Sequence, residues 1–383
     1  MTDGPLSGLR ILEFAGLGPA PFCAMMFADH GADVIRIDRL TAQADRFGVD
    51  PQADFVNRTR RSIAVDLKNP EGIAVLRALI RSADGIIEGF RPGVMERLGL
   101  GPDPLLVDNP RLVFGRMTGW GQTGPFGSSA GHDLNYVALS GALHGIGHAG
   151  GRPVPPLNLV GDYGGGAMML AFGMLAALRH ARNTGEGQVV DAAMIKGAAV
   201  LTTAIHAFHA VGDWIDQRGA NILDSGAPFY DSYETADGRY VSIAPIEPVF
   251  YQKLLELLGE GEDPILKRQY DKTLWPVQRA RLAAIFKART RDEWDALLGG
   301  SDACYAPVLT LGEAADHPQN VAVDAFIEVD GYKQPAPAPV YSRTPTMRPV
   351  PLALGADTTR EILSVAGFDD AAITILLEGQ VVA

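Results

Sequence analysis

Short apolar runs alternate with helix-like segments throughout the first half of the chain. Strands are predicted at residues 9–14, 33–37, 62–67, 85–90 and 112–117, with a helix over 19–30 between the first two. Asn69 and Pro70 begin a second helix, because Asn is a preferred N-cap and Pro fits the first helical position. Strands that alternate with helices predict a mostly parallel sheet with helices on both faces. The first half is therefore expected to form a Rossmann-like α/β domain.

A glycine turn, Gly16-Leu17-Gly18, joins the first predicted strand to the first helix. Asp38 ends the second strand about twenty residues later, a spacing typical of dinucleotide-binding folds. The dinucleotide fingerprint also needs a third glycine, and Pro21 occupies that position. The sequence therefore does not support an NAD site.

The alternation of strands and helices ends before an irregular polar stretch at 213–220. Strands at 230–234 and 239–244 flank Asp237-Gly238, a dipeptide that strongly indicates a β-hairpin. Helix-like segments follow at 248–258, 274–287 and 291–298. A smaller α+β domain is expected here.

The C-terminal part is expected to return to the first domain. A stretch rich in proline at 335–339 is typical of a linker, and helices are predicted at 358–366 and 370–377. The predicted organisation is a large domain over 1–200, a small domain over 223–325, and a segment over 335–383 that completes the large domain.

Charge and cysteine content limit the classes of partner. The formal net charge of −12 argues against nucleic acid, which requires a basic face. No apolar run looks long and uncharged enough to span a bilayer, and no secretory leader is recognised. Cys23 and Cys304 form neither a disulfide framework nor a metal set, and both are expected to be buried thiols. We therefore expect a cytoplasmic protein without a membrane partner.

Basic residues are concentrated near the ends of the predicted strands, where open α/β sheets bind ligands. They are Arg36, Arg39, Arg58, Arg60, Arg61, Lys68, Arg91 and Arg97. Because the chain as a whole is acidic, this placement favours a site for an anionic ligand such as a polyphosphate. The alternative is an ordinary solvated surface, where most charged residues lie.

The segment Gly131-His132-Asp133-Leu134-Asn135-Tyr136 precedes an apolar run, and a helix is predicted to begin near His132. Asp133 or Asn135 would serve the first turn, where free N–H groups favour negative charge. An imidazole beside such a site could move a proton next to a carbonyl group. The alternative is a histidine that only caps the helix.

Two carboxylates are further candidates. Asp162 precedes three glycines, and a helix that carries Met168, Met169 and Met174 is predicted over 167–182. Asp162 could simply be the N-cap of this helix, the glycines would allow a ligand or another backbone to approach, and the methionines fit either a core or an apolar ligand. Glu247 lies on a turn after a predicted strand, where an exposed surface glutamate is the simpler interpretation.

Motifs throughout the chain resemble the class III CoA-transferase (CaiB/BaiF-like) family, in particular its α-methylacyl-CoA racemase branch. They include Gly-Ala-Asp-Val-Ile-Arg-Ile-Asp-Arg at 31–39, Val-Asp-Leu-Lys at 65–68, Gly-Phe-Arg-Pro-Gly-Val at 89–94, Arg-Met-Thr-Gly-Trp-Gly-Gln-Thr-Gly-Pro at 116–125, Gly-His-Asp-Leu-Asn-Tyr at 131–136, Asn-Leu-Val-Gly-Asp at 158–162, Asp-Ala-Cys-Tyr-Ala-Pro-Val at 302–308 and Ser-Arg-Thr-Pro at 342–345.

The resemblance implies an interlocked homodimer, with each active site between the large domain of one chain and the small domain of its partner. It also implies an acyl-CoA substrate. The positions that would contact CoA are Arg39, Val65, Asp66, Leu67, Lys68, Gly89, Phe90, Arg91 and Arg97, and Gly131, Asp133, Leu134, Asn135 and Tyr136 would reach the thioester.

The activity implied by the resemblance is interconversion of (2R)- and (2S)-2-methylacyl-CoA through an enolate. His132 and Asp162 would be the acid/base pair, a backbone N–H near Asp133 would stabilise the enolate oxygen, and Glu247 would pair with His132. No metal or separate cofactor is expected, since CoA belongs to the substrate. Two alternatives remain: a CoA-transferase with Asp162 as nucleophile, and an acyl-CoA-binding protein without catalysis.

Overall fold

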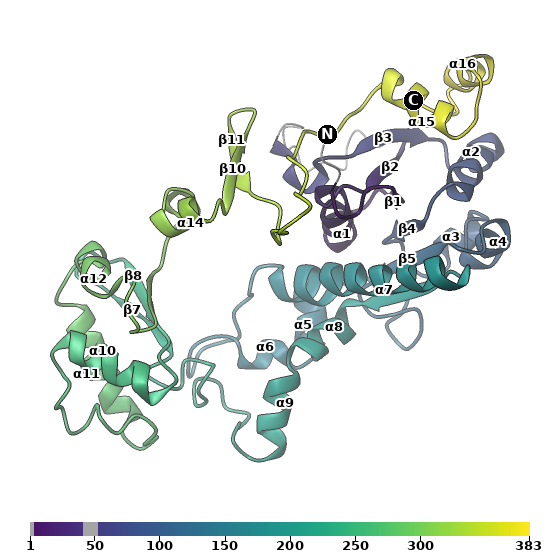
Figure 1. Ribbon diagram of the computed structural model, residues 1–383. Helices are drawn as coiled ribbons and strands as arrows, with labels where there is room; N and C mark the ends of the chain where they lie inside the picture. The colour runs from purple at the N-terminus through teal and green to yellow at the C-terminus, as the bar shows by residue number, and fades with distance from the viewer. Residues whose placement is uncertain (1–3, 41–52) are drawn as a thin grey trace. The chain divides into compact units, whose positions relative to one another are not determined.

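The computed structural model describes residues 4–40 and 53–383, which divide into two compact units. The first unit comprises Met1–Ser140, Leu157–Leu201 and Val323–Ala383, and the second comprises Gly141–Pro156 and Thr202–Ala322. The C-terminal helices pack beside the first strands, and Figure 1 shows α15 next to β3. Segments from both ends of the chain therefore build the first unit.

A six-stranded sheet forms the centre of the first unit. In spatial order its strands are β3 (Arg61–Val65), β2 (Asp33–Arg39), β1 (Arg10–Phe14), β4 (Gly85–Glu88), β5 (Val113–Thr118) and β6 (Gln188–Ala193). All neighbouring pairs are parallel. This is the strand order of doubly wound α/β folds, with the reversal between β1 and β4. The predicted fold class of the large domain is confirmed.

Both faces of the sheet are covered, as the near-continuous apolar strands require. Adjacent residues of β1 point to opposite faces: Ile11 packs with helices α1 (Pro19–Asp29) and α7 (Met169–Thr184). Leu12 packs with the other set, α2 (Pro70–Arg81), α4 (Pro102–Asp108), α15 (Ala356–Val365) and α16 (Asp370–Glu378). Shorter helices of this unit are η2 (Phe55–Asn57), α3 (Val94–Arg97), α5 (Asp133–Leu139) and α8 (Met194–Leu201).

The helix predicted over 167–182 begins earlier. A π-helical segment, η3 (Leu159–Met168), runs directly into α7 and makes a continuous helix of 26 residues. By length and composition this helix could cross a membrane, which differs from the expectation that no run qualifies. Leu170, Met174 and Leu178 pack against the sheet, so within the first unit it is a core helix.

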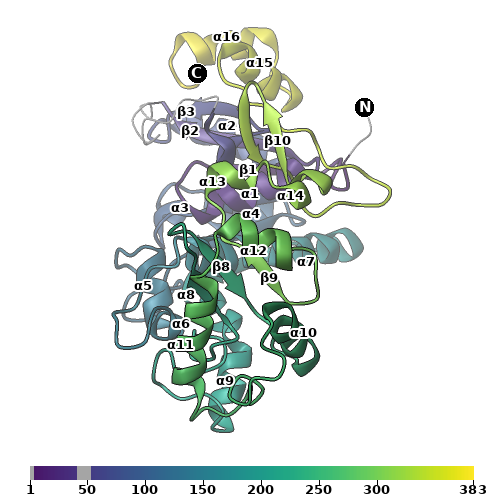
Figure 2. The same ribbon diagram turned by 90° about the vertical axis from the view of Figure 1, so that its left-hand side faces the viewer.

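The second unit contains a three-stranded antiparallel sheet of β7 (Asp231–Glu234), β8 (Tyr240–Ile243) and β9 (Tyr305–Pro307). Its helices are α6 (Ala142–Gly145), α9 (Thr203–Ala210), α10 (Pro248–Leu258), α11 (Trp275–Phe286), α12 (Arg291–Leu298), α13 (Leu311–Ala314) and α14 (Pro318–Ala322), most of them labelled in Figure 2. Phe229, Tyr233 and Phe286 lie in a single aromatic core. The predicted hairpin and α+β character are confirmed.

A second hairpin, absent from the sequence-based expectation, marks the return to the first unit. Strands β10 (Phe326–Val329) and β11 (Tyr332–Pro335) pair antiparallel. Arg58 donates to the Gln334 side chain and to the Pro335 carbonyl, both at 2.8 Å. The chain has therefore rejoined the first unit by Val323, ahead of the proline-rich stretch.

The two cysteines differ from each other. Cys23 is fully buried in α1, as expected, and burial raises the pKa of its thiol. Cys304 is exposed and has a positive φ of 49°, so the expectation that it is buried is wrong. It lies on the turn that leads into β9, outside the core to which its apolar neighbours belong.

Candidate active site

The predicted ligand-contacting segments meet at the carboxyl edge of the parallel sheet. Arg39 ends β2, Val65 ends β3 and is followed by Asp66–Lys68, and Gly89–Arg91 follow β4. The guanidinium carbon of Arg39 lies 5.7 Å from the centre of the Phe90 ring. This edge, at the β1/β4 reversal, is where doubly wound sheets bind ligands.

The basic residues of this half fall into two groups, those paired within the first unit and those that remain exposed. Arg36, Arg58, Arg60 and Arg61 form ion pairs with Asp38, Asp29, Glu13 and Asp33 respectively. These four guanidinium groups hold the first unit together. Arg39, Lys68, Arg91 and Arg97 are exposed, and in the described ranges none of them has an ion pair. The second group is available to an anionic ligand.

Asp162 lies within η3 and is not a helix N-cap, a position that Asn158 occupies. The Asp133 carboxylate accepts hydrogen bonds from the backbone N–H groups of Gly161 and Asp162, both at 2.7 Å. The Asn158 amide donates to the Asp162 carboxyl at 3.4 Å. A Cβ atom at Gly18 would lie 3.0 Å from the same carboxyl, so the glycine turn after β1 leaves room for it. Asp162 is thus held against the β1–α1 turn.

Burial is the main cause that raises the pKa of Asp162 above the usual aspartate value. The hydrogen bond from Asn158 lowers it, the negative charge of Asp133 raises it, and the positive form of His132 lowers it. The net shift is upward, which favours a protonated carboxyl that can act as a proton donor.

His132 is exposed at the N-terminus of α5, as predicted. The Asn135 side chain accepts the His132 backbone N–H at 3.1 Å, which fixes the first turn. Asp133 is buried and faces η3, whereas Leu134 is exposed. His132, Asp133 and Asp162 therefore come together in the first unit.

The Tyr136 ring requires glycine at two positions, one in the motif at 116–125 and one in the motif at 131–136. Its ring is buried and packs edge-on to Trp120, with centroids 4.7 Å apart. A Cβ atom at Gly119 would overlap the Tyr136 ring, and one at Gly131 would lie 2.8 Å from it. Burial, followed by the charges of Asp162 and Asp133, raises the pKa of Tyr136. Tyr136 therefore packs this loop beside Asp162.

The glycines after Asp162 allow two backbones to approach. A Cβ atom at Gly165 would lie 2.6 Å from the backbone nitrogen of Ala198 in α8. Of the methionines expected here, Met174 is completely buried against the sheet and Met168 is exposed. The glycines thus serve helix packing, and only part of the methionine face is core.

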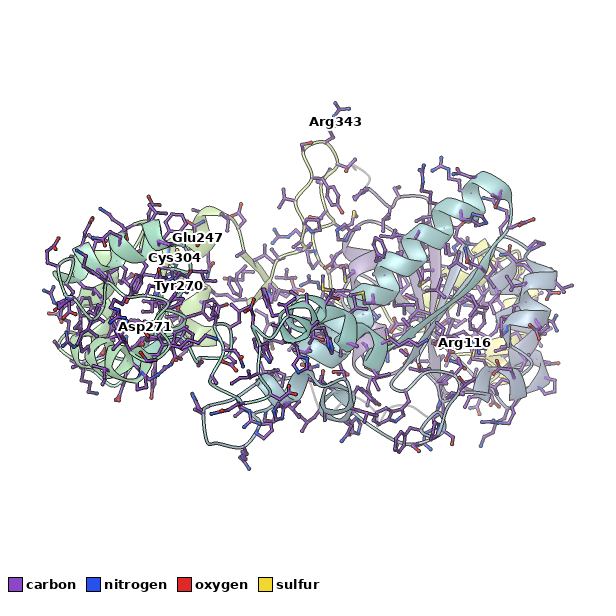
Figure 3. All side chains as sticks on the ribbon, turned by 90° about the horizontal axis from the view of Figure 1, so that it is seen from below. Arg116, Glu247, Tyr270, Asp271, Cys304 and Arg343 are labelled. Carbon is purple, nitrogen blue, oxygen red and sulfur yellow. The ribbon has the colours of Figure 1, made fainter. Side chains whose placement is uncertain are left out.

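Glu247 belongs to the second unit. It is the exposed N-cap residue of α10, and its side chain makes no capping hydrogen bond. Gln269 donates to the carbonyls of Pro245 and Ile246, both at 2.9 Å, and the Tyr270 hydroxyl also donates to Ile246. Figure 3 shows Glu247, Cys304 and Tyr270 at the same end of this unit. The turn that carries Glu247 is therefore rigidly supported.

Two buried charges at the sheet edge escaped the sequence analysis. Glu88 ends β4 and Arg116 is its register partner in β5. Both occur in otherwise apolar strands, and this was the available signal, because a charge in a buried strand needs a partner. For metals, the described ranges contain no group of three or more His, Cys, Asp or Glu arranged to hold an ion.

Comparison with known proteins identifies the family of the chain. The chain matches CoA-transferase family III over residues 6–358. It is 44% identical to alpha-methylacyl-CoA racemase of Mus musculus, covering 98% of this chain and 97% of that protein. It is 43% identical to alpha-methylacyl-CoA racemase of Homo sapiens, covering 89% and 88%. A crystal structure of a CaiB/BaiF family protein from Brucella suis matches with a TM-score of 0.78 at 25% identity, covering 94% of this chain and 100% of that one. The chain belongs to CoA-transferase family III.

Proposed function

We propose that the protein is a racemase that interconverts (2R)- and (2S)-2-methylacyl-CoA thioesters. The observation that carries the proposal is the placement of Asp162, a carboxyl whose pKa is raised by burial and which lies within electrostatic reach of His132. A racemase requires two acid/base groups at one carbon atom. The similarity to two racemases over most of the chain supports this chemistry over others in the family.

In the proposed reaction one group removes the α-proton, and negative charge develops on the thioester oxygen. The other group gives a proton to the opposite face of the enolate, so the substrate regains its hydrogen with inverted configuration. Asp162 is protonated when it acts as donor, and the upward shift of its pKa favours that state. Backbone N–H groups near Asp133, in the first turn of α5, would stabilise the enolate oxygen.

The exposed cations Arg39, Lys68, Arg91 and Arg97 would hold the phosphate groups of CoA, with segments 65–68 and 89–91 against its remaining parts. Residues 131–136 would reach the thioester. CoA is part of the substrate, and proton transfer at a single carbon needs no redox or metal cofactor.

We further propose that the working form is an interlocked homodimer in which Glu247 of a second copy orients His132. Exposed apolar side chains on the first unit support a covering partner, because large exposed apolar patches mark interaction sites. They are Leu159, Met168, Phe172, Leu175, Val200 and Leu201. An uncapped, rigidly held Glu247 is suited to contact another chain.

The test is to incubate the protein with (2R)-2-methylacyl-CoA in D₂O and to follow deuterium at the α-carbon and its configuration by NMR. The proposal predicts deuterium uptake with loss of configuration and no need for a second acid. His132→Ala and Asp162→Ala should each slow exchange at least about tenfold, since positioned acid/base groups typically contribute about 10² to 10⁴ in rate. Normal exchange in either variant would contradict the two-group assignment.

A CoA-transferase is the second candidate, because Asp162 could also attack a thioester as a nucleophile. In that case the same incubation would show no exchange. A second acyl-CoA would appear only after a free carboxylic acid is added.

A further inference from the structure

Arg116 lies on β5, two residues before the carboxyl end of the strand, and neither the proposed acid/base chemistry nor the proposed phosphate contacts use it. Its register partners are Glu88 on β4 and Asp191 on β6. The side chain is largely buried, and its guanidinium carbon lies 5.1 Å from the centre of the Phe114 ring. A buried guanidinium must be paired, and its partners show which segments it holds.

Three segments meet at this guanidinium: the end of β4, helix α3 and the loop that follows β5. Nη2 donates to the Glu96 carboxylate on α3, and Nη1 donates to the Gln122 side chain at 3.1 Å. Nε lies 3.7 Å from the Glu88 carboxylate at the end of β4. The planar, multidentate guanidinium suits this arrangement, whereas a lysine ammonium could not reproduce it.

Two of these partners, Glu88 and Glu96, lie close in sequence to the exposed cations Arg91 and Arg97. The second carboxylate oxygen of Glu88 accepts the backbone N–H of Phe90 at 2.7 Å and so fixes the chain beside Arg91. Glu96 precedes Arg97, and a Cβ atom at Gly93 would lie 3.1 Å from Nη1 of Arg97, so this guanidinium lies beside Gly93. After burial, which raises the pKa of Glu88 most, the positive charge of Arg116 lowers it and the negative charge of Glu96 raises it, so Arg116 offsets the repulsion between the two carboxylates.

We infer that Arg116 is a positioning residue for CoA binding, because it fixes the 89–91 loop and helix α3, which carry Arg91 and Arg97. The inference rests on the proposed acyl-CoA substrate. Arg116 and Gln122 both belong to the motif at 116–125, so that motif has a role in the same network. Arg116 contacts neither the acid/base groups nor the thioester, so the bound substrate should react normally once it is seated.

The test compares the full-length protein with Arg116→Lys and Glu96→Gln. The dissociation constant for CoA alone is measured by calorimetry, and KM and kcat are measured for 2-methylacyl-CoA. Each variant should weaken CoA binding and raise KM by about tenfold, as expected for loss of a supporting contact, with kcat within about twofold. The double variant should bind CoA no more weakly than the weaker-binding single variant, because both changes break the same contact.

The matched control is Arg77→Lys, which alters an arginine–aspartate pair that joins α2 to α4. It should leave CoA affinity unchanged. A folded Arg116→Lys protein with parental CoA affinity, or additive losses in the double variant, would overturn the inference. A parent protein that fails to bind CoA would overturn the proposed function and this inference together, so the two failures are distinguishable.

Discussion

The Asp133 carboxylate accepts the backbone N–H of Asp162 at 2.7 Å, together with that of Gly161 at the same distance. A residue at the start of α5 therefore fixes the π-helical segment that carries Asp162. The side chain of Asp133 supports the site, while its helix supplies the backbone N–H groups proposed for the enolate.

Asp133→Ala should remove both hydrogen bonds and let Asp162 shift. Leaving buried N–H groups without an acceptor costs about 1–3 kcal/mol, and a displaced acid/base group should reduce deuterium exchange by about tenfold or more. Asp369→Ala is the matched control, because Asp369 caps α16 by accepting the Ala372 N–H at 2.8 Å. It should lose about 1 kcal/mol of stability with unchanged exchange. Equal exchange in the two variants would contradict a supporting role for Asp133.

Asn158→Ala should move the pH profile of kcat. The Asn158 hydrogen bond lowers the pKa of Asp162, against the stronger upward effect of burial, so its loss leaves the pKa higher still. Asp162 must be protonated to donate a proton. In the reaction direction in which Asp162 is the donor, kcat therefore falls as pH rises through the pKa of Asp162. In the variant this fall in kcat should occur at higher pH. Asn109→Ala, which removes hydrogen bonds to Ile80 and Ala83, should leave the fall in kcat at the parental pH.

Gly119→Ala should damage the packing of the 119–125 loop. The added methyl group would overlap the buried Tyr136 ring, and overpacking of this kind typically costs about 1–3 kcal/mol. Gly16→Ala is a suitable control for stability, since its nearest atom, the Phe14 carbonyl oxygen, would be 3.9 Å away. Thermal unfolding of the two variants checks this, and equal melting temperatures would argue against the close packing of Tyr136.

The regular elements around the site were predictable because their signals are local. Asn69 and Pro70 begin α2 as expected, and the Asn69 side chain accepts the Glu71 N–H at 3.0 Å. The early start of the helix at Leu159 was not predictable in this way. It depends on the Asp133 carboxylate at η3, a contact between residues 28 apart.

The roles of the arginines also depended on distant partners. Arg58 pairs with Asp29 and with residues of β11, whereas Arg39 remains exposed, and nothing in the neighbouring sequence separates the two. Charges inside apolar strands were the more informative signal. Glu13 with Arg36, and Glu88 with Arg116, are register partners in neighbouring strands, so their positions alone could have predicted internal ion pairs.

Glu88→Gln should change how stability depends on pH. Burial raises the pKa of Glu88 from an ordinary 4.5 to about 7, so the folded protein holds this proton more tightly than the unfolded chain. The resulting stabilisation is complete below about pH 4.5 and is lost as pH rises towards 7. Relative to the parent, the free energy of unfolding of the glutamine variant should rise by up to roughly 3 kcal/mol across that range, at about 1.36 kcal/mol per unit of pKa shift. Urea unfolding between pH 4.5 and 8 measures the difference, and a constant difference would contradict the prediction.

Phe172→Glu should separate the proposed dimer. The Phe172 side chain is 74% exposed on α7, among other exposed apolar groups of the first unit, and a carboxylate there would be costly to bury against a second chain. Sedimentation velocity should show the parent as a dimer and the variant as a monomer or a weaker dimer. If Glu247 comes from the second copy, exchange activity should fall with dimer content and recover at high protein concentration.

Val107→Glu is the control for this change, since Val107 is similarly exposed (81%) but lies on α4, on the opposite face of the sheet from α7. It should leave both the oligomeric state and the exchange activity unchanged. A parent that sediments as a monomer and is fully active would rule out a shared active site. In that case Glu247 would have to act within its own chain or not at all, and the exchange rates of Glu247→Gln would decide between these two.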